Sequence, residues 1–148
     1  MRNWLKYLLV LCVLLFSAGI AVAQYVTIGA GTNNQDKLFK TNWEDARSIA
    51  TFSNAELTGA SLGLNVGDTI YSVGWYVKTL GGQAMYGANI KISESGSTST
   101  VWSGTLGPIT GWNDILLDVP YVRQGSGTLI VEYCFDNCEW TSDFIVRK

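Results

Sequence analysis

Hydrophobic and polar residues alternate with a period of two along several runs of the chain. In residues 69–79 and 129–135, every second residue is large and apolar. Successive side chains of a β-strand point to opposite faces, so this pattern is typical of strands with one buried face. The side chains that the alternation places in one core are Tyr71, Val73, Trp75, Val77, Ile90, Ile92, Ile115, Leu117, Leu129, Val131 and Tyr133.

Turn-forming residues separate these runs. Gly67-Asp68, residues 80–83 and the Gly/Ser stretch 123–127 mark turns, and residues 95–100 read as a flexible loop. Further strands are expected at 25–28, 46–52 and 101–103. About seven or eight strands at this spacing predict an all-β fold, a single antiparallel β-sandwich of the jelly-roll or immunoglobulin-like kind.

One helical turn interrupts the strands. Ser53 and Glu56 stand three residues apart, which is the spacing of a capping box at the start of a helix. No sustained helical period follows in the rest of the chain beyond the N-terminal segment.

The first 23 residues have the composition of a secretory signal peptide. Arg2 and Lys6 precede an apolar run at 8–16, and Ala21-Val22-Ala23 supplies the small residues of a cleavage site. The alternative is a membrane anchor, but the run is short for a hydrocarbon layer of about 30 Å. The sequence therefore predicts a signal peptide at 1–23 and one secreted or cell-surface domain at 24–148, which could be truncated at its C-terminal end.

The charge and the residue types exclude several functions. The formal net charge is −2, and no basic patch stands out, which disfavours nucleic acid and anionic membrane as partners. The chain has no histidine, so Ser-His-Asp and Cys-His nucleophile systems are excluded. A small glycoside hydrolase with a carboxylate pair stays as an alternative, with Glu44/Asp45 or Asp114/Asp118 as its candidates.

Two groups of residues near the C-terminus could bind or cross-link. Cys134 and Cys138 are the cysteines left after processing, and an even number in an exported protein favours a disulfide across a sharp turn. Oxygen-bearing side chains are dense in the same region and suit Ca²⁺, the one cofactor considered. The candidate ligands are Asp136, Asn137, Glu139 and Asp143; the alternative is a turn followed by a solvated strand.

Trp43 and Trp140 are the candidate ligand-binding residues. Both lie in polar, acidic surroundings outside the alternating runs. Exposed aromatic faces can bind ligands, and flat sugar faces suit them; the alternative is packing in the core or at a strand edge.

Several short motifs occur in the order found in one kind of extracellular module. They are Thr27 to Thr32, Arg47-Ser48, Ala55-Glu56-Leu57, Gly67 to Ile70, Trp102-Ser103-Gly104, Gly111-Trp112-Asn113 and the ending Cys134 to Asn137. The chain resembles a β-sandwich module of large secreted and surface proteins of Bacteroidetes-type bacteria. Residues 123–127 replace an acidic loop of that module.

Taken together, these features predict a non-catalytic extracellular module in adhesion or in surface or matrix architecture. A carbohydrate-binding module that uses exposed aromatics is the alternative. The expected partner is an extracellular polysaccharide or a surface protein, with no stable membrane span after processing.

The signal-peptide prediction is open to direct measurement. When the chain is expressed with its own residues 1–23 in a Gram-negative host, mass spectrometry of the exported protein should find Gln24 at the N-terminus. An exported protein that still begins at Met1 would contradict the prediction.

Overall fold

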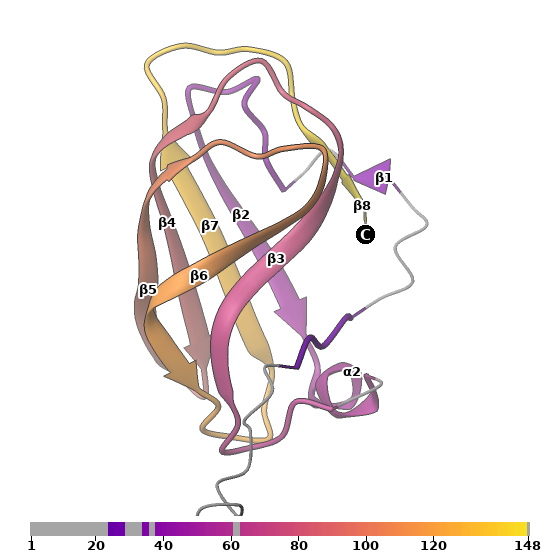
Figure 1. The fold of residues 1–148 in the computed structure, drawn as a ribbon. Helices are drawn as coiled ribbons and strands as arrows, with labels where there is room; N and C mark the ends of the chain where they lie inside the picture. Colours follow the sequence, from indigo (N-terminus) through magenta and orange to yellow (C-terminus); the bar gives the residue numbers. More distant parts are fainter. Residues whose placement is uncertain (1–23, 29–33, 36–37, 61–62, 148) are drawn as a thin grey trace, which may run out of the picture.

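The computed structural model describes residues 24–28, 34–35, 38–60 and 63–147. It confirms the all-β prediction: two four-stranded antiparallel sheets face one another as a β-sandwich (Figure 1). The predicted signal peptide lies outside the described residues. Residues 24–28 are described but form no strand, so the strand expected there is wrong.

The strand order is the same kind of crossover pattern in both sheets. The first sheet runs β1 (Asn34–Gln35), β8 (Ile145–Arg147), β3 (Thr69–Thr79) and β6 (Gly111–Val122). The second sheet runs β2 (Asp45–Phe52), β7 (Leu129–Asp136), β4 (Met85–Glu94) and β5 (Ser97–Leu106). Apart from β4 and β5, neighbours in each sheet come from distant parts of the chain, so the sandwich depends largely on non-local pairing.

The connection between β4 and β5 is a tight hairpin instead of the flexible loop expected at residues 95–100. Ser95 and Gly96 both have positive φ, 52° and 84°. Two successive residues of positive φ match the right-handed twist of a hairpin. Pairing resumes at once, with Glu94 opposite Ser97, and the strand expected at 101–103 extends over the whole of β5.

The core lies between the inner faces of the two sheets. Most residues that the alternation assigned to it are buried, among them Val77, Ile90, Ile92 and Val131. Four further core residues lie in segments without alternation or at the start of a strand: Phe39, Leu57, Met85 and Phe144. Phe39 stacks on Trp75 with ring centroids 4.8 Å apart, and Trp75 meets the Tyr133 ring edge-on at 4.6 Å. Aromatic packing across the two sheets therefore occupies the middle of the sandwich.

Tyr71 is the one predicted core residue that the structure places in solvent, with 60 % of its surface exposed. A bulge between β3 and β6 is the reason. Ile70 pairs with Tyr121, whereas Ser72 pairs with Leu116, so residues 117–120 lie opposite Tyr71 alone. A bulge changes which face the following side chains occupy. Tyr121 is consequently buried, although simple alternation did not select it.

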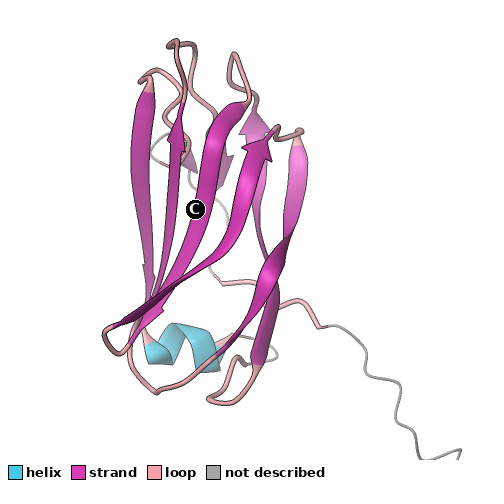
Figure 2. Cartoon of the chain, turned by 90° about the vertical axis from the view of Figure 1, so that its left-hand side faces the viewer, coloured by secondary structure: helices cyan, strands magenta, loops and turns pink. Residues whose placement is uncertain are grey.

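Helix α2 (Asn54–Gly59) closes one end of the sandwich (Figure 2). The predicted capping box is confirmed: the Ser53 hydroxyl accepts a hydrogen bond from the Glu56 backbone N–H, and the Glu56 carboxylate accepts one from the Ser53 N–H at 2.8 Å. Leu57 of this helix is completely buried. The helix is thus fixed at its start by the cap and along its length by one apolar anchor.

A buried ion pair joins four segments at the same end. Arg123 follows β6, and its Nε donates to Glu94 Oε1 at 3.3 Å; both side chains have no exposed surface. Arg123 Nη2 donates to Asn54 Oδ1 at 2.6 Å, and Nη1 donates to the Leu64 carbonyl. The second oxygen of Glu94 accepts from the Gln124 backbone N–H at 2.7 Å. Both charges are therefore paired and hydrogen-bonded, which is the condition under which burial of charge is tolerated.

An exposed ion pair lies on the outer face of the second sheet. Glu132 of β7 accepts from Arg47 of β2 and lies 3.5 Å from Lys91 Nζ of β4. The hydrogen bond from Arg47 lowers the pKa of Glu132 from its ordinary value, in spite of the opposing effect of burial. Arg47 itself is 64 % exposed, so solvent screens the attraction.

The two ion pairs should therefore respond differently to mutation. Arg123→Ala leaves the Glu94 carboxylate buried without its cation, and the free energy of unfolding should fall by about 3–5 kcal/mol. Arg47→Ala is the matched control and should change stability much less, because its partner stays near solvent. Urea denaturation of both variants measures the difference. Equal losses in the two variants would contradict a special role of the Arg123–Glu94 pair.

Candidate functional site

The end of the sandwich opposite α2 carries the loops on which the candidate binding residues lie (Figure 1). Four segments meet there: residues 38–44, 80–84, 107–110 and 137–144. We call this surface the loop end. Loops that a rigid sheet positions are a common place for binding residues.

Hydrogen bonds join segment 38–44 to segment 137–144. The Thr41 hydroxyl donates to the Ser142 carbonyl at 2.6 Å, and the Thr141 N–H donates to the Thr41 carbonyl at 2.8 Å. The Asn42 N–H donates to Asp143 Oδ1 at 2.8 Å. Thr41 is completely buried. The two segments are therefore ordered against each other although about a hundred residues separate them in the sequence.

Trp43 and Trp140 stand on these two joined segments. Their side chains are 61 % and 71 % exposed. The structure thus brings the segments of both candidate ligand-binding residues to one end of the molecule and leaves both rings open to solvent. Their role in binding stays a prediction.

The oxygen-rich residues predicted as calcium ligands do not form one cluster of free carboxylates. Asn137 is 3 % exposed, and its amide serves the neighbouring loop: Oδ1 accepts from the Tyr86 N–H at 2.8 Å and Nδ2 donates to the Ala84 carbonyl at 3.1 Å. Asp143 accepts from the backbone as described above, while Asp136 and Glu139 are exposed. Within the described ranges, no three acidic, cysteine or histidine side chains are grouped so that they could hold a metal ion.

The predicted disulfide is absent from the structure, where Cys134 and Cys138 are both free thiols. Cys134 lies inside β7, paired with Arg47 on one side and with Asn89 on the other. Its sulfur lies 2.8 Å from Asn89 Oδ1 and serves as a donor there. The strand continues to Asp136, so the sharp turn that a bridge to Cys138 needs does not begin at Cys134.

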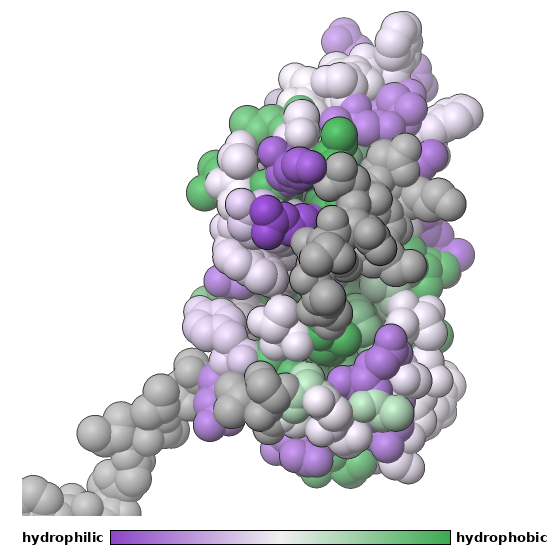
Figure 3. All heavy atoms as spheres, turned by 90° about the vertical axis from the view of Figure 1, so that its right-hand side faces the viewer, coloured by the Kyte–Doolittle hydropathy of each residue, from purple (hydrophilic) through white to green (hydrophobic). Residues whose placement is uncertain are grey.

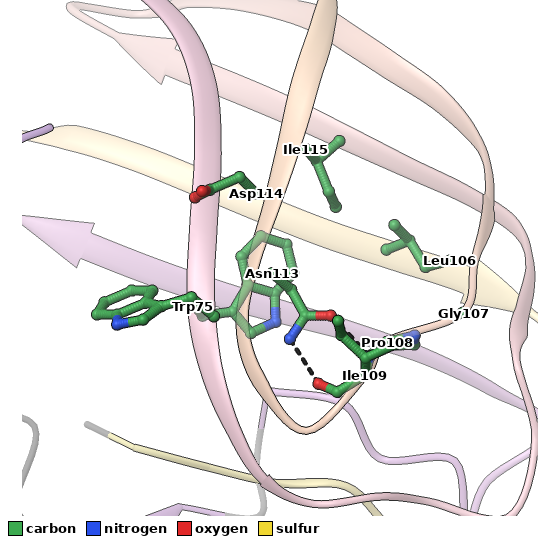
Figure 4. A pocket seen from close by; sticks show the side chains of 9 residues that line it. Trp75, Leu106, Gly107, Pro108, Ile109, Asn113, Asp114 and Ile115 are labelled. Atoms are coloured by element: carbon green, nitrogen blue, oxygen red, sulfur yellow. Dashed lines mark hydrogen bonds between the residues drawn. The ribbon is translucent and has the colours of Figure 1, made fainter. Parts of the chain in front are cut away.

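A hollow of about 420 Å³ opens beside the first strand residues of β6 (Figure 4). It is lined by Trp75 of β3, residues 106–109 at the end of β5, and residues 112–115 of β6. Asn113 fixes the wall formed by the loop: its Oδ1 accepts from the Ile109 N–H at 2.8 Å, and its Nδ2 donates to the Ile109 carbonyl at 2.7 Å. The Gly111-Trp112-Asn113 motif lies in this region, but nothing in the sequence pattern predicted a binding role for it.

The carboxylate pairs considered for hydrolysis are not assembled. Asp118 Oδ2 accepts from the Ser103 N–H at 3.2 Å, whereas Asp114 lies four residues away along β6, opposite Gly74 of β3. Asp45 pairs across the sheet with Asp136 at the edge of the second sheet, and Glu44 is exposed beside it.

Two tyrosines have raised pKa values. Burial raises the pKa of Tyr133, and burial together with the charge of Glu94 raises the pKa of Tyr121. Both phenols are thereby kept neutral.

Comparison of this chain with known proteins found no match. No protein-family model, no curated protein and no solved structure matches the chain. Among the described residues there is no helix of the length and apolarity needed to cross a bilayer.

The buried amide of Asn137 makes a testable contribution to the loop end. Asn137→Ala leaves the Ala84 carbonyl and the Tyr86 N–H without partners, and each such loss costs about 1–3 kcal/mol when the group stays buried. Asn42→Ala is the matched control, because Asn42 is exposed and uses only its backbone N–H in the bond to Asp143. Thermal melts should show a clear loss of melting temperature for Asn137→Ala alone.

The calcium prediction is tested by melting the wild-type protein with and without EDTA. Calcium bound to the native state raises the melting temperature, so EDTA should lower it. A melting temperature that EDTA leaves unchanged would contradict the calcium prediction.

Proposed function

We propose that this chain is a non-catalytic extracellular β-sandwich module for adhesion or for surface or matrix architecture, and that it makes its contacts through the loop end. The observation that carries the proposal is the exposure of Trp43 and Trp140 on two segments that hydrogen bonds join. A partner that covers both rings would gain the hydrophobic stabilisation that these side chains lack in the free protein.

Order at the loop end supports a binding role. The hydrogen bonds of Thr41 and Asn137 hold the backbone next to each tryptophan, so little conformational entropy is left to lose when a partner binds. Tryptophan is also the residue type most enriched among those that dominate binding energy at interfaces. Two exposed tryptophans on ordered segments match this description.

The separation of the acidic side chains supports a role without chemistry. The sequence has no histidine, and the candidate carboxylates point to separate places on the two sheets. Asp114 and Asp118 are four residues apart in β6, about 13 Å along a strand, which is wider than the spacing that glycoside hydrolysis needs.

Placement outside the cell is supported by the N-terminal sequence. The charged start, the apolar run and Ala21-Val22-Ala23 are the features of an export signal. The resemblance of the motifs to bacterial surface modules points to the same compartment. Secretion and a surface location are thus part of the proposal.

A carbohydrate-binding module is the second candidate function. Open indole faces are suited to the apolar faces of sugar rings, and an extracellular polysaccharide offers many copies of such a face. The exposure of Trp43 and Trp140 favours this candidate as much as it favours a protein partner.

An array that carries polysaccharides and extracellular-matrix proteins tests the proposal. The full chain should bind at least one immobilised polymer, release no product from it, and lose about tenfold or more in affinity in the double variant Trp43→Ala/Trp140→Ala. Tyr71→Ala is the control, because Tyr71 is about as exposed as Trp43 but lies near the start of β3, away from the loop end. Equal binding by the wild type and the double variant, or release of product, would contradict the proposal.

A further inference from the structure

Besides the two tryptophans of the loop end, a third tryptophan is open to solvent next to a hollow. Trp112 is 57 % exposed and lies on the outer face of β6. The ring of Tyr76 on β3 meets it edge-on, with centroids 5.9 Å apart and planes at 88°. The guanidinium of Arg147 on β8 covers the ring of Tyr76, at 4.0 Å from its centroid. These contacts cross three neighbouring strands and fix the Trp112 ring from one side while the rest of it faces solvent.

Asp114 lies two residues further along the same face. It pairs with Gly74, and a Cβ atom at Gly74 would come within 2.3 Å of Asp114 Oδ1. The carboxylate therefore lies against bare backbone, which is a common reason for glycine inside a strand. Within the described part of the chain, no side chain or N–H donates to this carboxylate. Its oxygens keep their full capacity to accept hydrogen bonds.

On the other side of β6, the loop that bounds the hollow is held in place before any ligand arrives. Asn113 bonds to both backbone groups of Ile109, and its Nδ2 also donates to the Gly111 carbonyl at 2.9 Å. Gly111 has a φ of 106°, which favours glycine over residues with a side chain. Figure 4 shows Asn113 directed at Ile109 across the turn. A wall that is already ordered costs a ligand little entropy.

We propose that the outer face of β6, at the rim of this hollow, is a binding subsite for a neutral pyranose, in which Trp112 stacks on the sugar ring and Asp114 accepts hydrogen bonds from its hydroxyl groups. The inference rests on the proposed binding function and names the ligand class. Trp112 and Asp114 both line the rim of the hollow and are open to solvent. The apolar C–H face of a pyranose fits the flat indole, and its hydroxyls are the donors that an unpaired carboxylate needs.

The charge of the site favours a neutral sugar over an acidic one. Asp114 would repel a uronate or a sulfate, and the chain as a whole is negative, with a formal net charge of −2. The guanidinium of Arg147 is stacked on Tyr76 in this row of side chains.

The subsite is continuous with the loop end, so one polysaccharide chain could contact both. Gly107 and Pro108, which line the hollow, also line a smaller hollow of about 110 Å³ together with Leu80 and Phe144. The Gly82 N–H, from segment 80–84, donates to the Ser142 carbonyl at 3.0 Å. Ser142 belongs to segment 137–144, which also carries Trp140. Figure 3 shows the side of the molecule near β1 and β8, where hydrophobic and hydrophilic residues are interspersed in small groups.

The test is isothermal titration of the full chain with neutral hexasaccharides: cellohexaose, xylohexaose and mannohexaose. At least one should bind, and Trp112→Ala should weaken it about tenfold or more, with Trp112→Phe restoring part of the loss. Asp114→Asn keeps the shape but removes the charge, and should weaken binding by a smaller factor. Tyr71→Ala, on the same sheet but away from the hollow, should bind as the wild type does. Because Trp112 and Asp114 are exposed, the variants should keep the wild-type melting temperature.

Three results would overturn the subsite. They are no binding of any of the three hexasaccharides, equal affinity of Trp112→Ala and the wild type, or tighter binding of a hexagalacturonate than of the neutral sugars. If Trp43→Ala/Trp140→Ala abolishes binding on the polymer array while Trp112→Ala leaves it intact, the subsite fails and the proposed function stands. If the array shows no binding but a hexasaccharide binds at Trp112, the contacts attributed to the loop end are wrong and the subsite stands.

Discussion

The pairing of Arg123 with Glu94 holds together the end of the sandwich on which the other elements depend. It joins the end of β4, the beginning of the β6–β7 connection, the start of α2 and the segment before β3. Two buried charges are costly unless every polar atom is satisfied, and here the carboxylate has both a cation and an N–H as partners. The pair therefore favours one arrangement of four segments over alternatives in which either charge would lie alone.

Much of the fold could be predicted because its signals are local. Period-two alternation identified β3, β4 and β7, and the spacing of Ser53 and Glu56 identified the start of α2. Tyr71 was misplaced because a bulge is a property of two strands together and leaves little trace in either one. Phe39 and Phe144 were not predicted as core residues because they lie in loops, where no alternation shows which side chains point inward.

The candidate binding residues could be only partly predicted from the sequence for the same reason. Exposure of Trp43 and Trp140 could be expected from their polar neighbours, but their meeting at one end depends on bonds between distant residues such as Thr41 and Ser142. The placement of Asp114 over Gly74 depends on the register between β3 and β6, which the sequence of either strand does not specify. Arg123 lies in a Gly/Ser-rich connection that reads as solvent-exposed, and only its distance from Glu94 in space reveals its structural role.

The bulge opposite Tyr71 has a consequence for how this sequence can change over time. In an uninterrupted strand pair, loss or gain of one residue turns every following side chain to the other face. Here residues 117–120 already lie opposite a single residue, and the pairs on either side, Ile70 with Tyr121 and Ser72 with Leu116, are set independently. This stretch can take up a length change locally, while the parts of β6 before and after it keep their own alternation of inward and outward side chains. Insertions and deletions should therefore accumulate at this stretch more readily than elsewhere in the strands, so that the outer surface of β6 can diversify while the interior is preserved.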